Sequence, residues 1–175
     1  MDEYETIMPW VNDIINFGYV GYDQQGDYGL IGYFNREIKQ DYDANLEFER
    51  ELKNCDNKAE FLINFSIDFA ERHIDELFDA VKKNSGSDDV PLDAVIIAAA
   101  AEIYKTAHNY LSKHEAFFYA DDYAKMQKDV GIFDTDDKAW DKGYDKYLSD
   151  NTMSINTCVN RVAKEYLNNK VLVKR

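Results

Sequence analysis

The stretch "PLDAVIIAAAAEIYKTAHNYLSKH", residues 91–114, decides the fold class of this 175-residue chain. Pro91 suits the first turn of a helix, because the N–H that proline lacks has no partner within the helix at that position. Apolar side chains recur at helical spacing, and the first half of the stretch is apolar or small on nearly every side. A helix that is apolar all round is a buried one. We therefore predict a central, buried helix over residues 91–114.

Helical periodicity of apolar side chains recurs along most of the remaining chain. The longest predicted helix runs over residues 57–83, where Leu62, Phe65 and Phe69 belong to an apolar stripe. The same periodicity predicts further helices over residues 9–17, 41–54, 121–130, 136–148 and 154–168. We therefore expect a mostly α protein, in which residues 1–175 form a single acidic helical domain of about six or seven helices.

The glycine-rich stretch "GYVGYDQQGDYGLIGYF", residues 18–34, fits either a small hairpin or a helix. A strand followed by a turn would make a hairpin near residues 19–34, whereas apolar side chains from Leu30 to Ile38 favour a helix over about residues 27–40. The glycines read G-x-x-G-x-x-G, and no P-loop lysine follows them. We interpret the stretch as architecture or as part of a tyrosine-rich contact surface, and we expect no nucleotide cofactor.

No motif in the sequence predicts catalysis or metal binding. His73, His108 and His114 occur outside any paired ligand motif, and Cys55 and Cys158 are far apart in no metal-ligand spacing. Both cysteines fall on apolar faces of predicted helices, so we expect buried, unpaired thiols in a reducing compartment. His73 is expected in the core and His108 on a solvated face. We expect a protein that is not an enzyme, with no catalytic residue, cofactor or metal.

The charge of the chain restricts its partners. The formal net charge is −14, and residues 1–60 contribute −9 of it through 14 acids and 5 bases. Such a chain repels nucleic acid and anionic membranes, which need basic side chains to neutralise phosphates. It attracts basic proteins instead. The start "MDEYETIMPW" lacks the features of a signal peptide, and no apolar run reaches the length of a membrane span. We therefore expect a cytoplasmic protein that binds neither nucleic acid nor membrane directly.

One group of acids shares a face of the predicted 57–83 helix, opposite its apolar stripe. It extends about 16 Å along the helix axis, at about 1.5 Å per residue. A neighbouring predicted helix adds four more acids. The predicted partner-binding residues are Asp68, Glu71, Asp75 and Asp79 on the 57–83 helix, and Asp41, Asp43, Glu47 and Glu49 on the 41–54 helix. Two interpretations remain open. The acids form either a solvated face that improves solubility, or a contact surface whose charge spacing imitates a nucleic-acid backbone.

In size, acidity, helical pattern and tyrosine content, the whole chain resembles inhibitors of bacterial defence carried by phages and mobile elements. These include antirestriction proteins and anti-CRISPR proteins that occupy the nucleic-acid channel of a nuclease. The resemblance rests on composition and transfers no individual residue. It implies a non-enzymatic inhibitor in the cytoplasm of a bacterial host cell, where a DNA-mimicking acidic surface blocks nucleic-acid binding by a basic defence enzyme or nuclease complex.

A second resemblance covers roughly residues 10–107. The order of "YDQQGDYGLIGYF" and "LDAVIIAAAAEIY" is similar to the layout of an uncharacterised bacterial domain family. Some small acidic proteins of this kind neutralise secreted toxins. This implies an alternative function as an immunity protein against a nuclease toxin. An assembly factor and an unrecognised enzyme are the remaining alternatives, and the sequence leaves the oligomeric state open.

Overall fold

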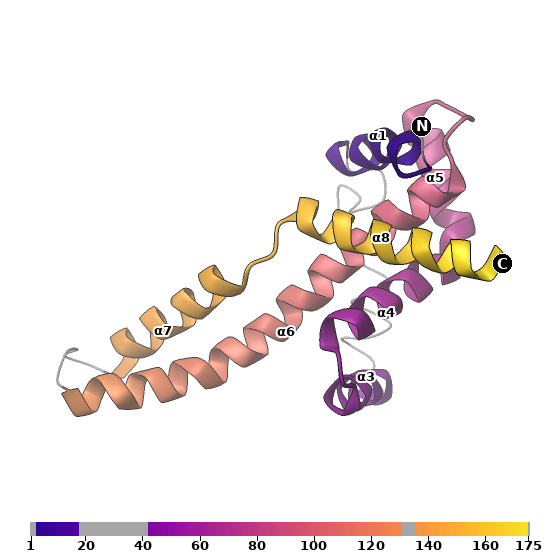
Figure 1. Ribbon diagram of the computed structural model, residues 1–175. Helices are drawn as coiled ribbons and strands as arrows, with labels where there is room; N and C mark the ends of the chain where they lie inside the picture. The colour runs from indigo at the N-terminus through magenta and orange to yellow at the C-terminus, as the bar shows by residue number, and fades with distance from the viewer. Residues whose placement is uncertain (1–2, 18–41, 131–135, 175) are drawn as a thin grey trace. The chain divides into compact units, whose positions relative to one another are not determined.

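The structure, a computed structural model, describes residues 3–17, 42–130 and 136–174 (Figure 1). All regular structure in these residues is α-helical, which confirms the mostly α expectation. The described helices are α1 (Glu3–Asn16), α3 (Tyr42–Asn54), α4 (Lys58–Arg72), α5 (Ile74–Ser85), α6 (Leu92–Val130), α7 (Asp136–Asn151) and α8 (Ile155–Lys174). The hairpin or helix predicted within residues 18–40 lies outside the described residues.

Backbone packing divides the chain into two compact units. The first comprises Met1–Lys105 and Ile155–Arg175, and the second comprises Thr106–Ser154. The first unit therefore holds the first part of α6 together with α1, α3, α4, α5 and α8, and the second holds the rest of α6 together with α7. The expectation that the whole chain folds as one domain stays a prediction. None of the described helices is both long enough and apolar enough to cross a bilayer.

The start of α6 is the buried helix that the sequence predicted. All residues from Ala94 to Ala101 are buried, and Ile103 and Tyr104 extend this buried stretch. The predicted end of the helix near residue 114 is wrong, because α6 continues without interruption to Val130 and absorbs the separate helix predicted over residues 121–130. No glycine or proline interrupts residues 114–121, and buried Ala116, Ala120 and Ala124 recur every fourth residue.

The first helix begins earlier than predicted. It starts at Glu3 and contains Pro9 in its interior, rather than starting at Pro9. The buried side chains of α1 are Ile7, Val11 and Ile14, which share one helical face. Ile7 lies before the proline, so burying this face requires a helix that extends upstream of it.

The long helix predicted over residues 57–83 is two helices in the structure. Asn57 caps the start of α4, and its side-chain oxygen accepts a hydrogen bond from the Glu60 backbone N–H at 3.1 Å. The chain leaves helical geometry at His73, where φ is −107° and ψ is 15°. There the His73 N–H bonds to the Ala70 carbonyl at 3.2 Å, and the His73 carbonyl accepts the Leu77 N–H at 3.1 Å to begin α5.

Two side-chain hydrogen bonds connect α8 to the first part of α6. The Tyr166 hydroxyl donates to Asp93 at 2.7 Å, and the Arg161 guanidinium donates to the Tyr104 hydroxyl at 3.2 Å. Backbone packing also places α4 against α8, and α3 against α4.

Candidate partner-binding surface

The acids that the sequence singled out are exposed wherever the structure describes their side chains. Asp68 and Glu71 lie on α4, Asp75 and Asp79 on α5, and Glu47 and Glu49 on α3. Asp41 and the side chain of Asp43 lie outside the described part of the structure. The break at His73 corrects one expectation, because the four acids of the predicted 57–83 helix are divided between α4 and α5 and form no row on a single helix.

The structure instead brings some of these acids together with new ones at a groove between α3 and α4. The groove has a volume of about 560 Å³. Its described lining residues are Ala44, Glu47, Phe48 and Glu51 from α3, and Phe65, Asp68 and Arg72 from α4. Two predicted site residues, Glu47 and Asp68, are therefore part of one concave surface. Glu49, Asp75 and Asp79 are exposed but do not line it.

A row of phenylalanines holds the two helices at this spacing. Phe61, Phe65 and Phe69 recur every fourth residue on one face of α4, with successive ring centroids 6.4 and 6.1 Å apart. Phe48 of α3 packs against this row, at 4.8 Å from Phe65 and 6.0 Å from Phe61. Phe48 is buried and Phe65 is half-buried, so the groove has an aromatic wall beneath its charged side chains.

The groove is predominantly negative. Three of its described lining side chains are carboxylates, from Glu47, Glu51 and Asp68, and one is a guanidinium, from Arg72. The Arg72 guanidinium carbon lies 5.3 Å from the centroid of the Phe69 ring, a cation–π distance. Partial burial, together with the nearby charge of Asp68, raises the pKa of Glu71 above its usual value. The negative charge of Asp68 therefore acts on Glu71, which is exposed and does not itself line the groove.

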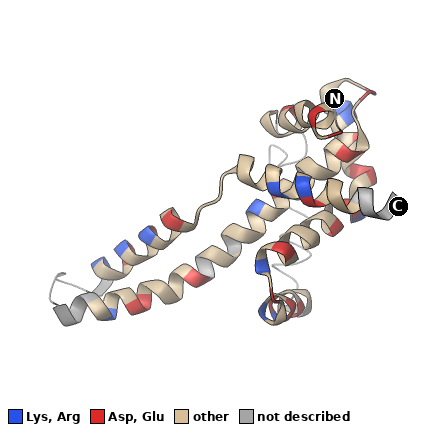
Figure 2. Ribbon diagram, viewed as in Figure 1, with Lys and Arg blue, Asp and Glu red and all other residues tan. Residues whose placement is uncertain are grey.

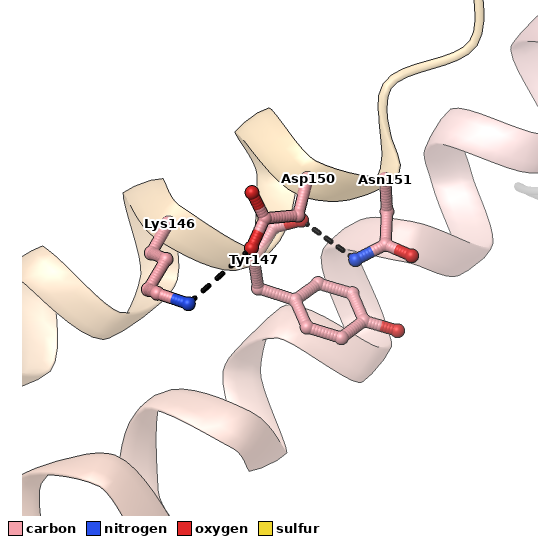
Figure 3. Close-up of polar contacts among 4 residues, drawn as sticks. All are labelled: Lys146, Tyr147, Asp150 and Asn151. Carbon is pink, nitrogen blue, oxygen red and sulfur yellow. Dashed lines mark hydrogen bonds and ion pairs between the residues drawn. The ribbon is translucent and has the colours of Figure 1, made fainter.

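The second unit shows a different distribution of charge. Lysines recur every fourth residue on α7, at positions 138, 142 and 146, with aspartates between them (Figure 2). Lys146 pairs with Asp150 at 3.4 Å, and both side chains are more than half exposed (Figure 3). In the same turn, the Asn151 side-chain amide donates to the Tyr147 carbonyl at 2.8 Å (Figure 3). This is a mixed-charge helix surface, and it supplies no one-sided acidic face.

The remaining polar candidates have structural contacts. His73 is half-buried, with its ring centroid 4.9 Å from that of Phe69. His108 does not lie on the solvated face expected for it. It is half-buried, and its Nε2 donates to the Asn151 carbonyl at 2.7 Å. Among the residues that the structure describes, no group of three or more His, Cys, Asp or Glu side chains is arranged to hold a metal ion.

Sequence reasoning missed Glu51, Phe48 and Phe65 as members of the site. Glu47 and Glu51 are four residues apart and therefore share a face of α3, which is a signal that the sequence contains. Their convergence with Asp68 depends on how α3 packs against α4. Comparisons of the chain with protein-family models, with curated proteins and with solved structures found no match.

Proposed function

We propose that this chain is a non-enzymatic binding protein that holds a basic protein partner in the groove between α3 and α4. The observation that supports the proposal is the convergence of Glu47 and Glu51 from α3 with Asp68 from α4 on one concave, phenylalanine-backed surface. Exposed acids scattered over a helix are usually a solvated face. Carboxylates that share a groove with apolar side chains offer a partner both charge complementarity and apolar contact.

The partner that best fits this surface is a nucleic-acid-binding protein. Such proteins present lysine and arginine to phosphates, so their binding surfaces are complementary to carboxylates. A net charge of −14 steers this encounter over a distance, because the summed field of the chain attracts a basic surface before contact. Occupying the partner's basic surface would block its nucleic acid. In this proposal the chain is therefore an inhibitor of a basic bacterial defence enzyme, of the antirestriction or anti-CRISPR type.

The first test is to isolate the partner and to compete for it. The tagged chain is used to capture proteins from a bacterial lysate, and the bound fraction is eluted with a salt gradient or with duplex DNA or RNA. We expect a basic, nucleic-acid-binding protein that nucleic acid displaces. A partner that nucleic acid does not displace would overturn the inhibitor proposal.

Two variants of equal charge then separate the groove from net charge. The groove variant carries Glu47→Gln, Glu51→Gln and Asp68→Asn, and the matched control carries Glu49→Gln, Asp75→Asn and Asp79→Asn outside the groove. Each exposed ion pair contributes only about 0.2–1 kcal/mol, so three are changed together. We expect slower association and a shallower salt dependence for the groove variant than for the control. Equal association rates for the two variants would show that only overall charge matters.

A further inference from the structure

We propose that the groove between α3 and α4 selects arginine over lysine, so that its occupant is an arginine-bearing segment of the basic partner. This inference rests on the proposed function, because it specifies the chemistry of the partner at the same site. Three features of the groove support it: its aromatic wall, the excess of carboxylates among its described lining residues, and a guanidinium that already stacks on the same row of rings.

The aromatic wall favours a planar cation. Phe65 is half-buried and lines the groove together with Phe48, and the two ring centroids are 4.8 Å apart with the rings tilted by 54°. Part of this aromatic surface therefore contacts whatever occupies the groove. A guanidinium is planar and more weakly hydrated than an ammonium, so it loses less hydration when it stacks on a ring. An ammonium is compact and strongly hydrated, and it gains less from the same surface.

The described lining residues of the groove include more carboxylates than basic side chains. They are Glu47, Glu51 and Asp68 with one basic residue, Arg72, so the net charge of the described lining is −2. A carboxylate can accept two parallel hydrogen bonds from one guanidinium, which an ammonium cannot donate in the same geometry. Carboxylates at the rim and phenyl rings below them would thus contact the two chemically different parts of an arginine side chain, its charged head and its flat face.

Arg72 shows that the same row of rings accommodates a guanidinium. Its guanidinium carbon lies 5.3 Å from the centroid of Phe69, and the Phe69 ring is stacked with that of Phe65 at 6.1 Å. An arginine from the partner over Phe65 would repeat this arrangement one helical turn away, beside Asp68. A second copy of this chain is a poor occupant, because two chains of charge −14 repel each other.

The test compares two peptides of the same length and charge on the full-length protein, one with three arginines and one with three lysines in a glycine–serine background. Binding is measured by calorimetry at low and at moderate salt. We expect both peptides to bind in a salt-dependent manner, and the arginine peptide to bind at least about threefold more tightly. Equal affinities would overturn the arginine inference and leave the proposed function standing. Binding of neither peptide would count against both.

Two ring variants then locate the selectivity. Phe65→Leu removes the ring that lines the groove but keeps apolar volume, and Phe78→Leu makes the same change on α5, in a ring outside the row and outside the groove. We expect Phe65→Leu to lose the preference for arginine and Phe78→Leu to keep it. A preference that survives in Phe65→Leu would overturn the role of the ring. If Phe65→Leu fails to fold, the peptide comparison on the unsubstituted protein still decides the inference.

Discussion

Cys158 and Cys55 differ in how deeply the fold buries their side chains. Cys158 is fully buried on α8, as expected from the apolar face of its predicted helix, and neither cysteine forms a disulfide. Cys55 is only half-buried, which corrects the expectation that both thiols are buried, and its Sγ lies 3.0 Å from the Leu52 carbonyl oxygen just after the end of α3. Burial raises the pKa of the Cys158 thiol to about 11.

We therefore expect the two cysteines to react at very different rates with a thiol reagent. The thiolate is the reactive form, and at pH 8 a thiol with a pKa of about 11 is almost entirely protonated as well as inaccessible. Cys55 should label quickly and Cys158 only on unfolding. The measurement is the labelling rate at pH 8 of Cys55→Ser and of Cys158→Ser, each with and without denaturant. Rapid labelling of native Cys55→Ser would mean that Cys158 is not buried as the structure has it.

At the scale of helices, the packing of the second unit depends on a close approach of α6 and α7 at Gly143. A Cβ at Gly143 of α7 would lie 2.9 Å from side-chain atoms of Tyr123 on α6, including its Cβ. Aromatic and polar contacts extend along the same two helices. Trp140 donates to Asp121 at 2.9 Å, and the Tyr119 and Tyr147 rings are 5.4 Å apart. Gly143 therefore sets the distance at which the other contacts form.

Gly143→Ala should destabilise the protein, although alanine is the better helix former. Helix propensity alone would stabilise α7 by up to about 1 kcal/mol. The added methyl group would meet Tyr123 near its backbone, and overpacking of this kind costs about 1–3 kcal/mol. We expect a net loss of free energy of unfolding in urea denaturation. Ser149→Ala, at an exposed position of the same helix, is the control and should change stability little. A Gly143→Ala protein that is more stable would show that the helices lie further apart.

For the whole molecule, the open question is whether the two compact units unfold together. The two tryptophans report on them separately, since Trp10 lies in the first unit and Trp140 in the second. The expectation of a single domain predicts that both units lose structure at the same denaturant concentration. Because α6 belongs to both units, unfolding of either removes packing from the same helix.

The measurement uses tryptophan fluorescence of Trp10→Phe and of Trp140→Phe, each compared with the circular dichroism of the same variant. We expect the fluorescence and dichroism transitions to coincide within each protein, as in a two-state unfolding reaction. Within one variant, a fluorescence midpoint clearly apart from the dichroism midpoint would instead mean that the two units are separate folding domains.

Much of the fold could be predicted because helical periodicity is a local property of the sequence. The stretch from Ala94 to Ala101 is apolar or small on nearly every side, and the structure buries all of it. The predicted end of this helix near residue 114 was wrong, although Ala116, Ala120 and Ala124 continue the apolar spacing of α6 without a glycine or proline. The break at His73 could not be predicted, because no helix-breaking residue marks it.

The sequence by itself determined the helical class, the buried start of α6 and the exposure of acids such as Asp68. Each follows from residues three or four apart on one helix, or from the charge of the side chain itself. Only the tertiary structure decided which acids share a surface. Glu47 and Glu51 line the same groove as Asp68 because Phe48 packs against Phe65 across two helices, a contact between residues 17 positions apart that no spacing within a single helix encodes.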